Sequence, residues 1–160
     1  MPMPIHMEVE GDTQGAIEGE CEMKGREKTI EVYGLEHAIE IPTNPQDGQP
    51  VGKRRHKQLK VVKLVDKTSP LLAMALCTGE PLTVKLKWFR QAGSKEEHYF
   101  TTELQGAHIV DLRTYIPNVF DPKNAEYQHM EECAFAYQKI VWTHETEGKQ
   151  AEDDWLAPVE

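Results

Sequence analysis

LTVKLKWFRQAGSKEEHYFTTEL, residues 82–104, is the stretch that determines the fold class. Apolar side chains occupy every second position from Leu82 to Trp88, and Thr or Lys fills the positions between them. This alternation predicts a β-strand with one face in the core. The segment QAGSK then turns the chain and residues 97–104 run back, so the stretch predicts a β-hairpin.

The same period of two recurs along most of the chain. It predicts further strands at residues 5–9, 29–41, 56–65, 107–115 and 133–142, with a break at Gly34 in the second of them. Residues 41–55 hold three prolines and two glycines, and we expect them to form a long loop. A second loop is expected at residues 117–130, and the acidic segment 146–160 is expected to be a mobile tail.

One helix is predicted, between Thr68 and Gly79. Thr68 or Ser69 is expected to accept hydrogen bonds from the first free amide groups, and Pro70 suits the first turn. Gly79 suits the left-handed position past the helix end. Because apolar residues surround this helix, we expect the sheet to cover most of it. About seven strands and one short helix together predict a mainly β fold, a closed or nearly closed antiparallel β-barrel.

Length and composition describe one globular domain. The 160 residues, 39% of them apolar and 28% charged, predict a single domain over residues 1–160, with residues 156–160 as a flexible tail. The sequence contains no window of about 20 apolar residues, the length of a membrane span. The N-terminus lacks the basic start and apolar run of a signal peptide. Three widely spaced cysteines without a CxxC pair predict neither disulfides nor a zinc site, and indicate folding in a reducing compartment.

The charge is unevenly distributed along the chain. Residues 52–72 carry +6, because seven Lys or Arg stand against the single acid Asp66, and the remaining residues carry −15, since the whole chain carries −9. Residues 1–40 and 121–160 each hold ten acids and three bases. The seven bases of this basic segment are Lys53, Arg54, Arg55, Lys57, Lys60, Lys63 and Lys67.

Three interpretations of the basic segment are open: it binds a nucleic acid, it binds another copy of this acidic chain, or it is a solvated patch. A nucleic-acid site would combine positive charge with aromatic side chains for stacking, and the segment has no aromatic residue apart from His56. The acidic remainder would also repel a polyanion. A neighbouring copy offers complementary acidic surface, and such a contact joins two different surfaces, which produces rings or stacks.

No catalytic, cofactor-binding or metal-binding residue stands out. The seven histidines include no HExxH motif and no pair at helical spacing on the predicted helix. Cys77 lies on that helix and is expected to pack rather than to react. A β-barrel enzyme remains an alternative, because Cys77, a histidine and an acid distant in sequence could still converge in space.

Several motifs together resemble one known family. They are IEV at 30–32, HxIxxP at 37–42, HKxL at 56–59, KxxDKxSPxL at 63–72, ALxxG at 75–79, LxxAxI at 104–109, FxYxxIxW at 135–142 and DDW at 153–155. This pattern closely resembles the haemolysin-coregulated protein (Hcp) family, the inner-tube subunit of the type VI secretion system. The resemblance covers nearly the whole chain, and the block from His56 to Gly79 is its most specific part.

The resemblance implies a two-sheet β-barrel with one flanking helix, assembled as a hexameric ring whose copies stack into a tube. Such a tube is built in the cytoplasm inside a contractile sheath, is tipped by a spike protein, and is expelled with effector proteins. The resemblance implies no enzyme activity and no cofactor. In the family the long loop reaches across the interface between rings, so Lys53, Arg54, Arg55 and Lys57 are expected to meet the acidic surface of the next ring and to set its register.

The chain departs from the family pattern in one strand. Where the family commonly has polar outward residues, this sequence has Cys133, Ala134 and Ala136. If one of them faces the lumen, the cargo preference should differ from that of relatives. Only a short acidic tail follows Trp142, so we expect effectors to travel as separate chains or on the spike.

Overall fold

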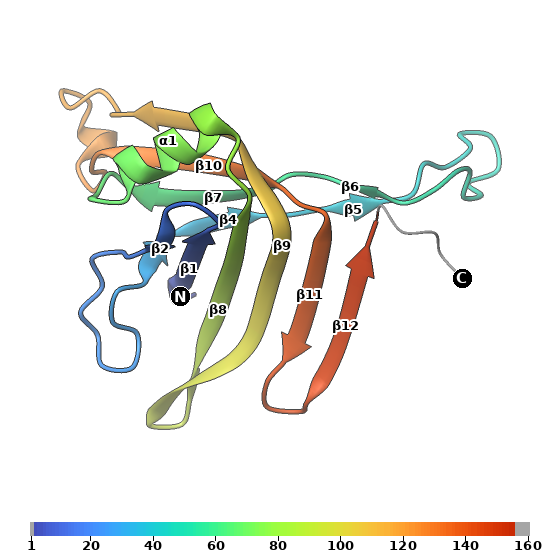
Figure 1. Ribbon diagram of the computed structural model, residues 1–160, viewed down its shortest axis with the longest axis horizontal. Coiled ribbons are helices and arrows are strands. Elements are labelled where there is room, and N and C mark those ends of the chain that lie inside the picture. Colours follow the sequence, from blue (N-terminus) through green and yellow to red (C-terminus); the bar gives the residue numbers. More distant parts are fainter. Residues whose placement is uncertain (1, 156–160) are drawn as a thin grey trace.

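The computed structural model describes residues 2–155 and consists of antiparallel sheets with one α-helix (Figure 1). The expected flexible tail at 156–160 lies outside these residues. No helix in the described part of the chain is long and apolar enough to span a bilayer. The elements are β1 (Ile5–Gly11), β2 (Gly15–Ile17), β3 (Ile30–Val32), β4 (Gly34–Glu36), β5 (Ile39–Glu40), β6 (Arg55–His56), β7 (Leu59–Leu64), α1 (Ser69–Thr78), β8 (Leu82–Ala92), β9 (Lys95–Tyr115), the 3-10 helix η1 (Pro122–Asn124), β10 (Met130–Ala136), β11 (Lys139–His144) and β12 (Lys149–Asp154).

The hairpin that determines the fold class is confirmed as β8 and β9, and β9 is the strand that joins the two sheets. Its first half pairs with β8 and β11, and its second half pairs with β10. The sequence predicted two separate strands here, but the chain runs through as one strand of 21 residues. Gly106, with φ 59°, lies where β9 bends from one sheet into the other.

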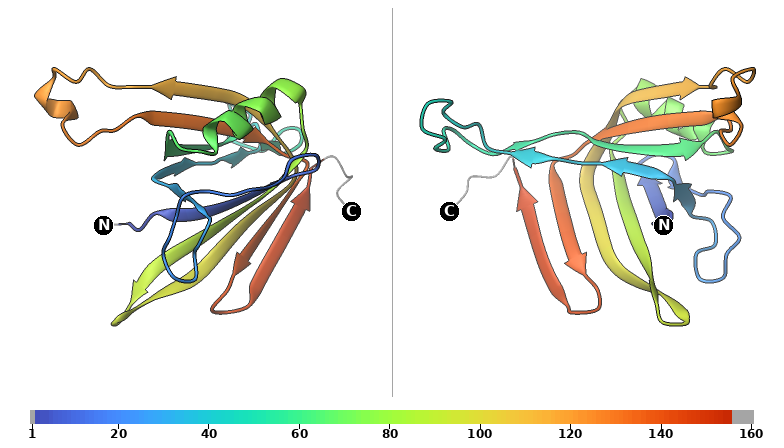
Figure 2. Two further views of the ribbon diagram at one scale, coloured as in Figure 1. Left: turned by 60° about the vertical axis from the view of Figure 1, so that its left-hand side comes forward. Right: turned by 180° about the vertical axis from the view of Figure 1, so that it is seen from behind.

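The bend of β9 also explains why the strand predicted at 133–142 is divided. β10 follows the second half of β9 and ends at Ala136, and β11 follows the first half and begins at Lys139. The chain therefore crosses between the sheets at Tyr137 and Gln138, and the two sheets diverge from this line (Figure 2).

The barrel is not closed by one continuous ladder. The paired strands follow an open path, β2-β1-β8-β9-β10-β7-β4. β3 pairs with β1, and β4 pairs with β7, so the bent segment 30–36 leads from an edge of one sheet to an edge of the other. The break in this segment falls at Tyr33 rather than at the predicted Gly34, which is the first residue of β4.

The core lies between the two sheets and is made of the alternating residues that the sequence indicated. Met7, Val84, Leu86 and Leu104 are fully buried from one sheet. Val61 and Phe135 meet them from the other and are fully buried as well. Burying a side chain of this size stabilises the fold by about 1.5–3 kcal/mol, so the hairpin and its neighbours account for much of the stability.

The helix confirms some predictions and contradicts others. Pro70 lies in the first turn, and Gly79 ends the helix in the left-handed conformation with φ 68°. The predicted side-chain cap is wrong, because Thr68 makes no capping hydrogen bond. The expectation that the helix is largely covered is also wrong: Leu72 and Ala75 are buried, whereas Leu71, Met74 and Cys77 are exposed.

The mobile tail expected from residue 146 is wrong for its described part. Residues 149–154 form β12, which pairs with β11 in full register from Lys139–Asp154 to His144–Lys149. Polar residues occupy both faces of this edge strand, so it shows no alternation of apolar and polar residues that would have predicted it.

Candidate functional site

The segment predicted as a long loop is a projecting hairpin, which we call the arm and define as residues 39–56. β5 and β6 pair at its base, and Val51 N donates to the Pro42 carbonyl at 2.7 Å farther out. Asn44 N donates to the Gln49 carbonyl at 2.8 Å near the tip. The arm extends away from both sheets at the end of the molecule opposite the 116–129 loop (Figures 1 and 2).

Exposed cations and exposed apolar side chains occur together on the arm. Lys53 and Arg55 are exposed, and so is Lys57 just beyond the arm, 3.5 Å from Glu40. An exposed ion pair at this distance contributes little to stability. The apolar side chains of Ile39, Ile41 and Val51 are between 41% and 47% exposed. A surface of this composition resembles the buried centre and polar rim of a protein interface.

Arg54 differs from the other three bases that were expected to contact a neighbouring ring. Its guanidinium turns back toward the body and holds Asp153, with Nε 2.6 Å from Oδ2 and Nη2 2.8 Å from Oδ1. Nη2 also donates to the Asp154 carbonyl at 3.2 Å. The hydrogen bonds from Arg54 keep the pKa of Asp153 below its usual value. Arg54 is therefore part of the anchor of the arm.

Two histidines and a tyrosine complete this anchor. His56 Nε2 lies 2.6 Å from Asp153 Oδ2, and His56 Nδ1 lies 2.7 Å from the hydroxyl oxygen of Tyr137. His37 Nε2 lies 2.6 Å from the same hydroxyl. Burial lowers the pKa of His37 and raises that of Tyr137. Trp155 stacks on His56 with ring centroids 5.9 Å apart and donates from its indole N–H to the Tyr137 carbonyl.

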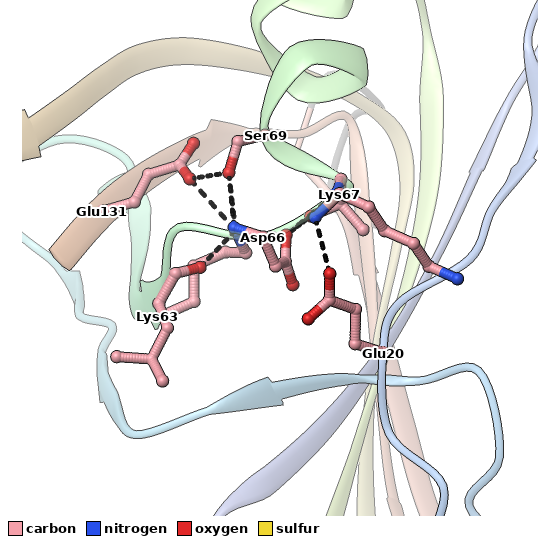
Figure 3. A network of polar contacts seen from close by, with 8 residues as sticks. Glu20, Lys63, Asp66, Lys67, Ser69 and Glu131 are labelled. Atoms are coloured by element: carbon pink, nitrogen blue, oxygen red, sulfur yellow. Dashed lines mark hydrogen bonds and ion pairs between the residues drawn. The ribbon is translucent and has the colours of Figure 1, made fainter. Parts of the chain in front are cut away.

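Lys63, another base of the basic segment, is fully buried (Figure 3). Its ammonium group donates to Glu131 at 3.1 Å, to Asp66 at 3.1 Å and to the Leu64 carbonyl at 2.9 Å. The Ser69 hydroxyl donates to the same Glu131 oxygen. This network joins β7, β10 and the start of α1, and it pairs the Lys63 ammonium group with two carboxylates inside the protein.

The same network explains why the predicted helix cap is absent. Asp66 Oδ1 accepts hydrogen bonds from both the backbone N–H and the hydroxyl of Thr68, and the Asp66 N–H donates to Ser69 Oγ at 3.0 Å. The two hydroxyl groups are therefore engaged with acids. Lys67 N donates to Glu20 at 3.1 Å, which ties the turn to the segment after β2 (Figure 3).

The cysteines do not form the constellation that an enzyme of this kind would need. Cys77 is exposed on α1, so its predicted packing role is wrong. Cys21 Sγ lies 3.8 Å from His6 Nδ1, and both residues are buried. Burial raises the pKa of the Cys133 thiol to about 12. Within residues 2–155 no group of three or more His, Cys, Asp or Glu is placed to hold a metal ion.

The residues that depart from the family pattern are mostly buried within the protomer. Cys133 is 1% exposed and Ala134 is 3% exposed, so neither presents its side chain at a surface of the protomer. Ala136 is partly exposed at the end of β10.

Sequence reasoning found the arm and its exposed bases but missed the anchor. His37, Tyr137 and Asp153 come from three segments, and Tyr137 is 100 residues from His37. These residues lie in the motifs HxIxxP, FxYxxIxW and DDW, and membership of these motifs was the one indication in the sequence that they have a role. The contacts between them depend on the bend of β9 and on β12, neither of which was predicted.

Known proteins share both the sequence pattern and this fold. The family model described as "Type VI secretion system effector, Hcp" matches residues 6–144. The "Major exported protein" of Pseudomonas aeruginosa is 43% identical over 170 residues, which include 99% of each chain.

Two solved structures extend the comparison to three dimensions. One, described as "Crystal structure of Hcp protein", has a TM-score of 0.88 at 34% identity and covers 95% of this chain and 97% of the other. "Secreted protein Hcp3 from Pseudomonas aeruginosa" has a TM-score of 0.77 at 35% identity, with 95% and 99% covered. With a family model over most of its length and relatives similar from end to end, the chain belongs to the Hcp family of type VI secretion system proteins.

Proposed function

We propose that this protein is a tube subunit of the type VI secretion system, and that hexameric rings of it stack into a tube. The observation that carries the proposal is the arm, which presents exposed cations and apolar side chains at one end of a chain whose net charge is −9. An arm of this kind fits a different, acidic surface on another copy, and contacts between different surfaces repeat along a stack.

The exposed side chains of the arm have two roles in stacking: the bases set the register and the apolar side chains become buried. Lys53 and Arg55, with Lys57 beside the arm, meet acidic surface of the next ring and set register, because opposite charges orient partners more than they add affinity. Ile39, Ile41 and Val51 are the apolar side chains that become buried and hold the contact. Arg54 contributes indirectly, by fixing the arm through Asp153.

Further exposed apolar side chains supply contact surface for neighbouring copies. Phe120 is 91% exposed and Val119 is 71% exposed on the 116–129 loop, and Met74 is 56% exposed on α1. Large apolar groups of this kind mark interaction surfaces when they cluster on an otherwise soluble protein.

The structural role also accounts for how the protein leaves the cell. Its relative in Pseudomonas aeruginosa is named a major exported protein. We propose that this chain assembles in the cytoplasm inside a contractile sheath, that a spike protein tips the tube, and that the tube is exported with effector proteins held noncovalently in its lumen. The family membership supports this sequence of events.

The protein is proposed to work without catalysis, without a cofactor and without nucleic acid. Two of the seven bases that suggested a polyanion site are engaged within the protomer: Lys63 is buried with Glu131, and Arg54 is paired with Asp153. The exposed bases that remain are divided between the arm, which carries Lys53 and Arg55, and the body, which carries Lys60 on β7 and Lys67 before α1, and they form no single polyanion site.

The oligomeric state tests the proposal. The mass of the purified protein, measured by light scattering at moderate salt, should correspond to a hexamer, and negative-stain images should show open rings. A stable monomer under these conditions would contradict the proposal.

A further inference from the structure

A hollow of about 510 Å³, which we call the end hollow, lies at the end of the molecule opposite the arm. It is formed where β7 ends, where the 116–129 loop returns to β10, and where the chain leaves β2 (Figure 1). Its volume is in the range of about 300–1,000 Å³ that binding pockets have. Among the residues that line it are Glu20, Glu31, Tyr33, Val65 and Asp66.

The lining of the end hollow is acidic. Glu20 Oε1 accepts a hydrogen bond from the Lys67 backbone N–H at 3.1 Å (Figure 3), and Glu31 Oε2 accepts one from the Tyr33 hydroxyl. Asp66 is paired with the buried lysine of β7. Neither Glu20 nor Glu31 forms an ion pair with a Lys or Arg side chain among the described residues. The protomer therefore leaves two negative charges in the hollow without a cationic partner.

Exposed apolar surface borders these carboxylates. Tyr33 is 49% exposed and Val65 is 43% exposed, and both line the end hollow. The arm has the corresponding composition with the opposite charge, since it exposes three aliphatic side chains beside two cations. Charge alone would attract any cation, whereas the added apolar surface favours a partner whose cations are accompanied by apolar side chains. The two surfaces are therefore complementary in both respects.

The positions of the arm and the end hollow suit a contact that repeats along a stack. β7 begins at Leu59, shortly after the arm ends at His56, and it ends at Leu64, which lines the hollow. A strand of this length spans roughly 17 Å. Figures 1 and 2 show the arm beyond one end of the sheets and the segments 18–29 and 116–129 at the other. Different surfaces at opposite ends of a protomer join copy to copy without limit.

Other hollows suit the arm less well. One adjoins the arm itself and includes Lys57 and Lys60, which would repel the cations of an incoming arm. Another lies along β1, β2, β8 and β9, and there Lys28 and Lys85 accompany the acids. Within residues 2–155, no Lys or Arg lines the end hollow.

We propose that the end hollow receives the arm of a second copy of this chain, which belongs to the neighbouring ring. The arm cations Lys53 and Arg55 then lie against the unpaired carboxylates of the hollow. The aliphatic side chains of the arm cover Tyr33 and Val65. This inference rests on the proposed role of the arm in stacking and adds the surface that the arm contacts. Each ring then presents arms on one face and end hollows on the other, so stacks grow head to tail.

Charge reversal in the end hollow tests the contact. Glu20→Lys/Glu31→Lys is expected to keep the hexameric mass in light scattering and to lose stacks in negative-stain images, because like charges then face each other. The matched control is Glu10→Lys/Glu103→Lys, which makes the same change at one exposed and one partly exposed acid of another hollow and should stack like the wild type.

Two results would overturn the inference at this stage. One is stacks of wild-type length in Glu20→Lys/Glu31→Lys. The other is a folded variant that no longer forms hexamers, which would place the contact within a ring. If the double variant does not fold, Glu20→Lys alone, at an exposed position outside the strands, replaces it and should shorten the stacks. Stacks of unchanged length in that variant would overturn the inference as well.

A mixture of two variants tests whether the arm and the end hollow touch each other. Rings of Lys53→Glu/Arg55→Glu have an acidic arm and an acidic hollow, and rings of Glu20→Lys/Glu31→Lys have a basic arm and a basic hollow. Neither preparation should stack alone. Their mixture should form stacks of alternating rings, because every arm then meets a hollow of opposite charge. A mixture without stacks would overturn the inference.

The results for the wild type and the arm variant separate this inference from the proposed function. If wild-type rings stack, the arm variant does not, and the end-hollow variant stacks normally, the arm joins the rings through another surface. The inference then fails and the proposed function stands. Wild-type protein that forms no stacks at low or moderate salt would contradict the proposed function, and the inference would fail with it.

Discussion

Arg54 and Asp153, 99 residues apart in sequence, form a two-point ion pair that fastens the arm to the last described strand. The pair places the basic arm and the acidic C-terminal segment in one structural unit. A segment that was expected to be a mobile tail thus positions the surface that we propose for stacking.

Loss of this ion pair should loosen the arm without unfolding the sheets. Arg54→Ala is expected to increase hydrogen exchange in the arm and to lower the melting temperature, because Asp153 loses its bidentate partner. Arg55→Ala, which removes the exposed neighbouring base on the arm, should change neither quantity. Equal behaviour of the two variants would show that the ion pair does not anchor the arm.

Removal of the buried ammonium group should have a large effect on stability. Lys63→Met leaves Glu131, which is 1% exposed, without its cationic partner, and is expected to lower the free energy of unfolding by about 3–5 kcal/mol in urea at fixed protein concentration. Lys60→Met alters an exposed lysine of the same strand and should stay within about 0.5 kcal/mol of the wild type. A cost below about 1 kcal/mol for Lys63→Met would mean that the network of Figure 3 is not essential to the fold.

The stability of the fold should fall in mild acid. Burial lowers the pKa of His98, which stacks on Phe89 with centroids 5.2 Å apart, below 6.5. The unfolded chain therefore binds more protons as the pH falls below 6.5, and the contribution of neutral His98 is lost as the pH passes through its lowered pKa.

Urea denaturation at a series of pH values measures this dependence. His98→Gln is expected to flatten the fall in unfolding free energy below pH 6.5, whereas replacement of the exposed His108 by Gln should leave the slope as it is. A slope in His98→Gln that matches the wild type would contradict a lowered pKa of the partly buried His98.

The cysteines should differ sharply in reactivity. Burial raises the pKa of Cys133 from 9.0 to about 12, so its thiolate population at mildly alkaline pH is about a thousandfold lower than that of an ordinary thiol. Iodoacetamide should therefore modify the exposed Cys77 first, as peptide mapping would detect, and Cys77→Ser should abolish the fast reaction. Rapid modification of Cys133 in the folded protein would show that β10 is less well packed than the structure indicates.

Much of the fold could be predicted because its strands bury one face. Apolar residues at every second position show this in the sequence itself, as Ile5, Met7 and Val9 do in β1 and as the alternating residues of β8 do. The bend of β9 was mistaken for a break between two strands, because the alternation shifts phase at Gly106, from Leu104 to Ala107, and a sequence does not show whether such a shift ends a strand or bends it. β12 gave none either, since an edge strand with both faces polar looks like a solvated tail.

The candidate site was predictable in part for a related reason. The local density of positive charge located the arm. A count of charges, however, does not distinguish bases that are exposed from bases that are paired within the protomer. Lys63 lies on an inward position of β7, and Arg54 meets an acid that comes from the other end of the chain. Which bases remain free for a partner is decided by tertiary contacts, and a single sequence does not record them.

The most direct test of the account is the length of stacks formed by Lys53→Glu/Arg55→Glu in negative-stain images, under conditions in which the wild type stacks. The matched control is Lys95→Glu/Lys149→Glu, which makes the same charge change at exposed lysines outside the arm. The account expects Lys53→Glu/Arg55→Glu to keep the hexameric mass in light scattering and to lose stacking, while the control stacks normally. Stacks of wild-type length in the arm variant would contradict the claim that the arm joins one ring to the next.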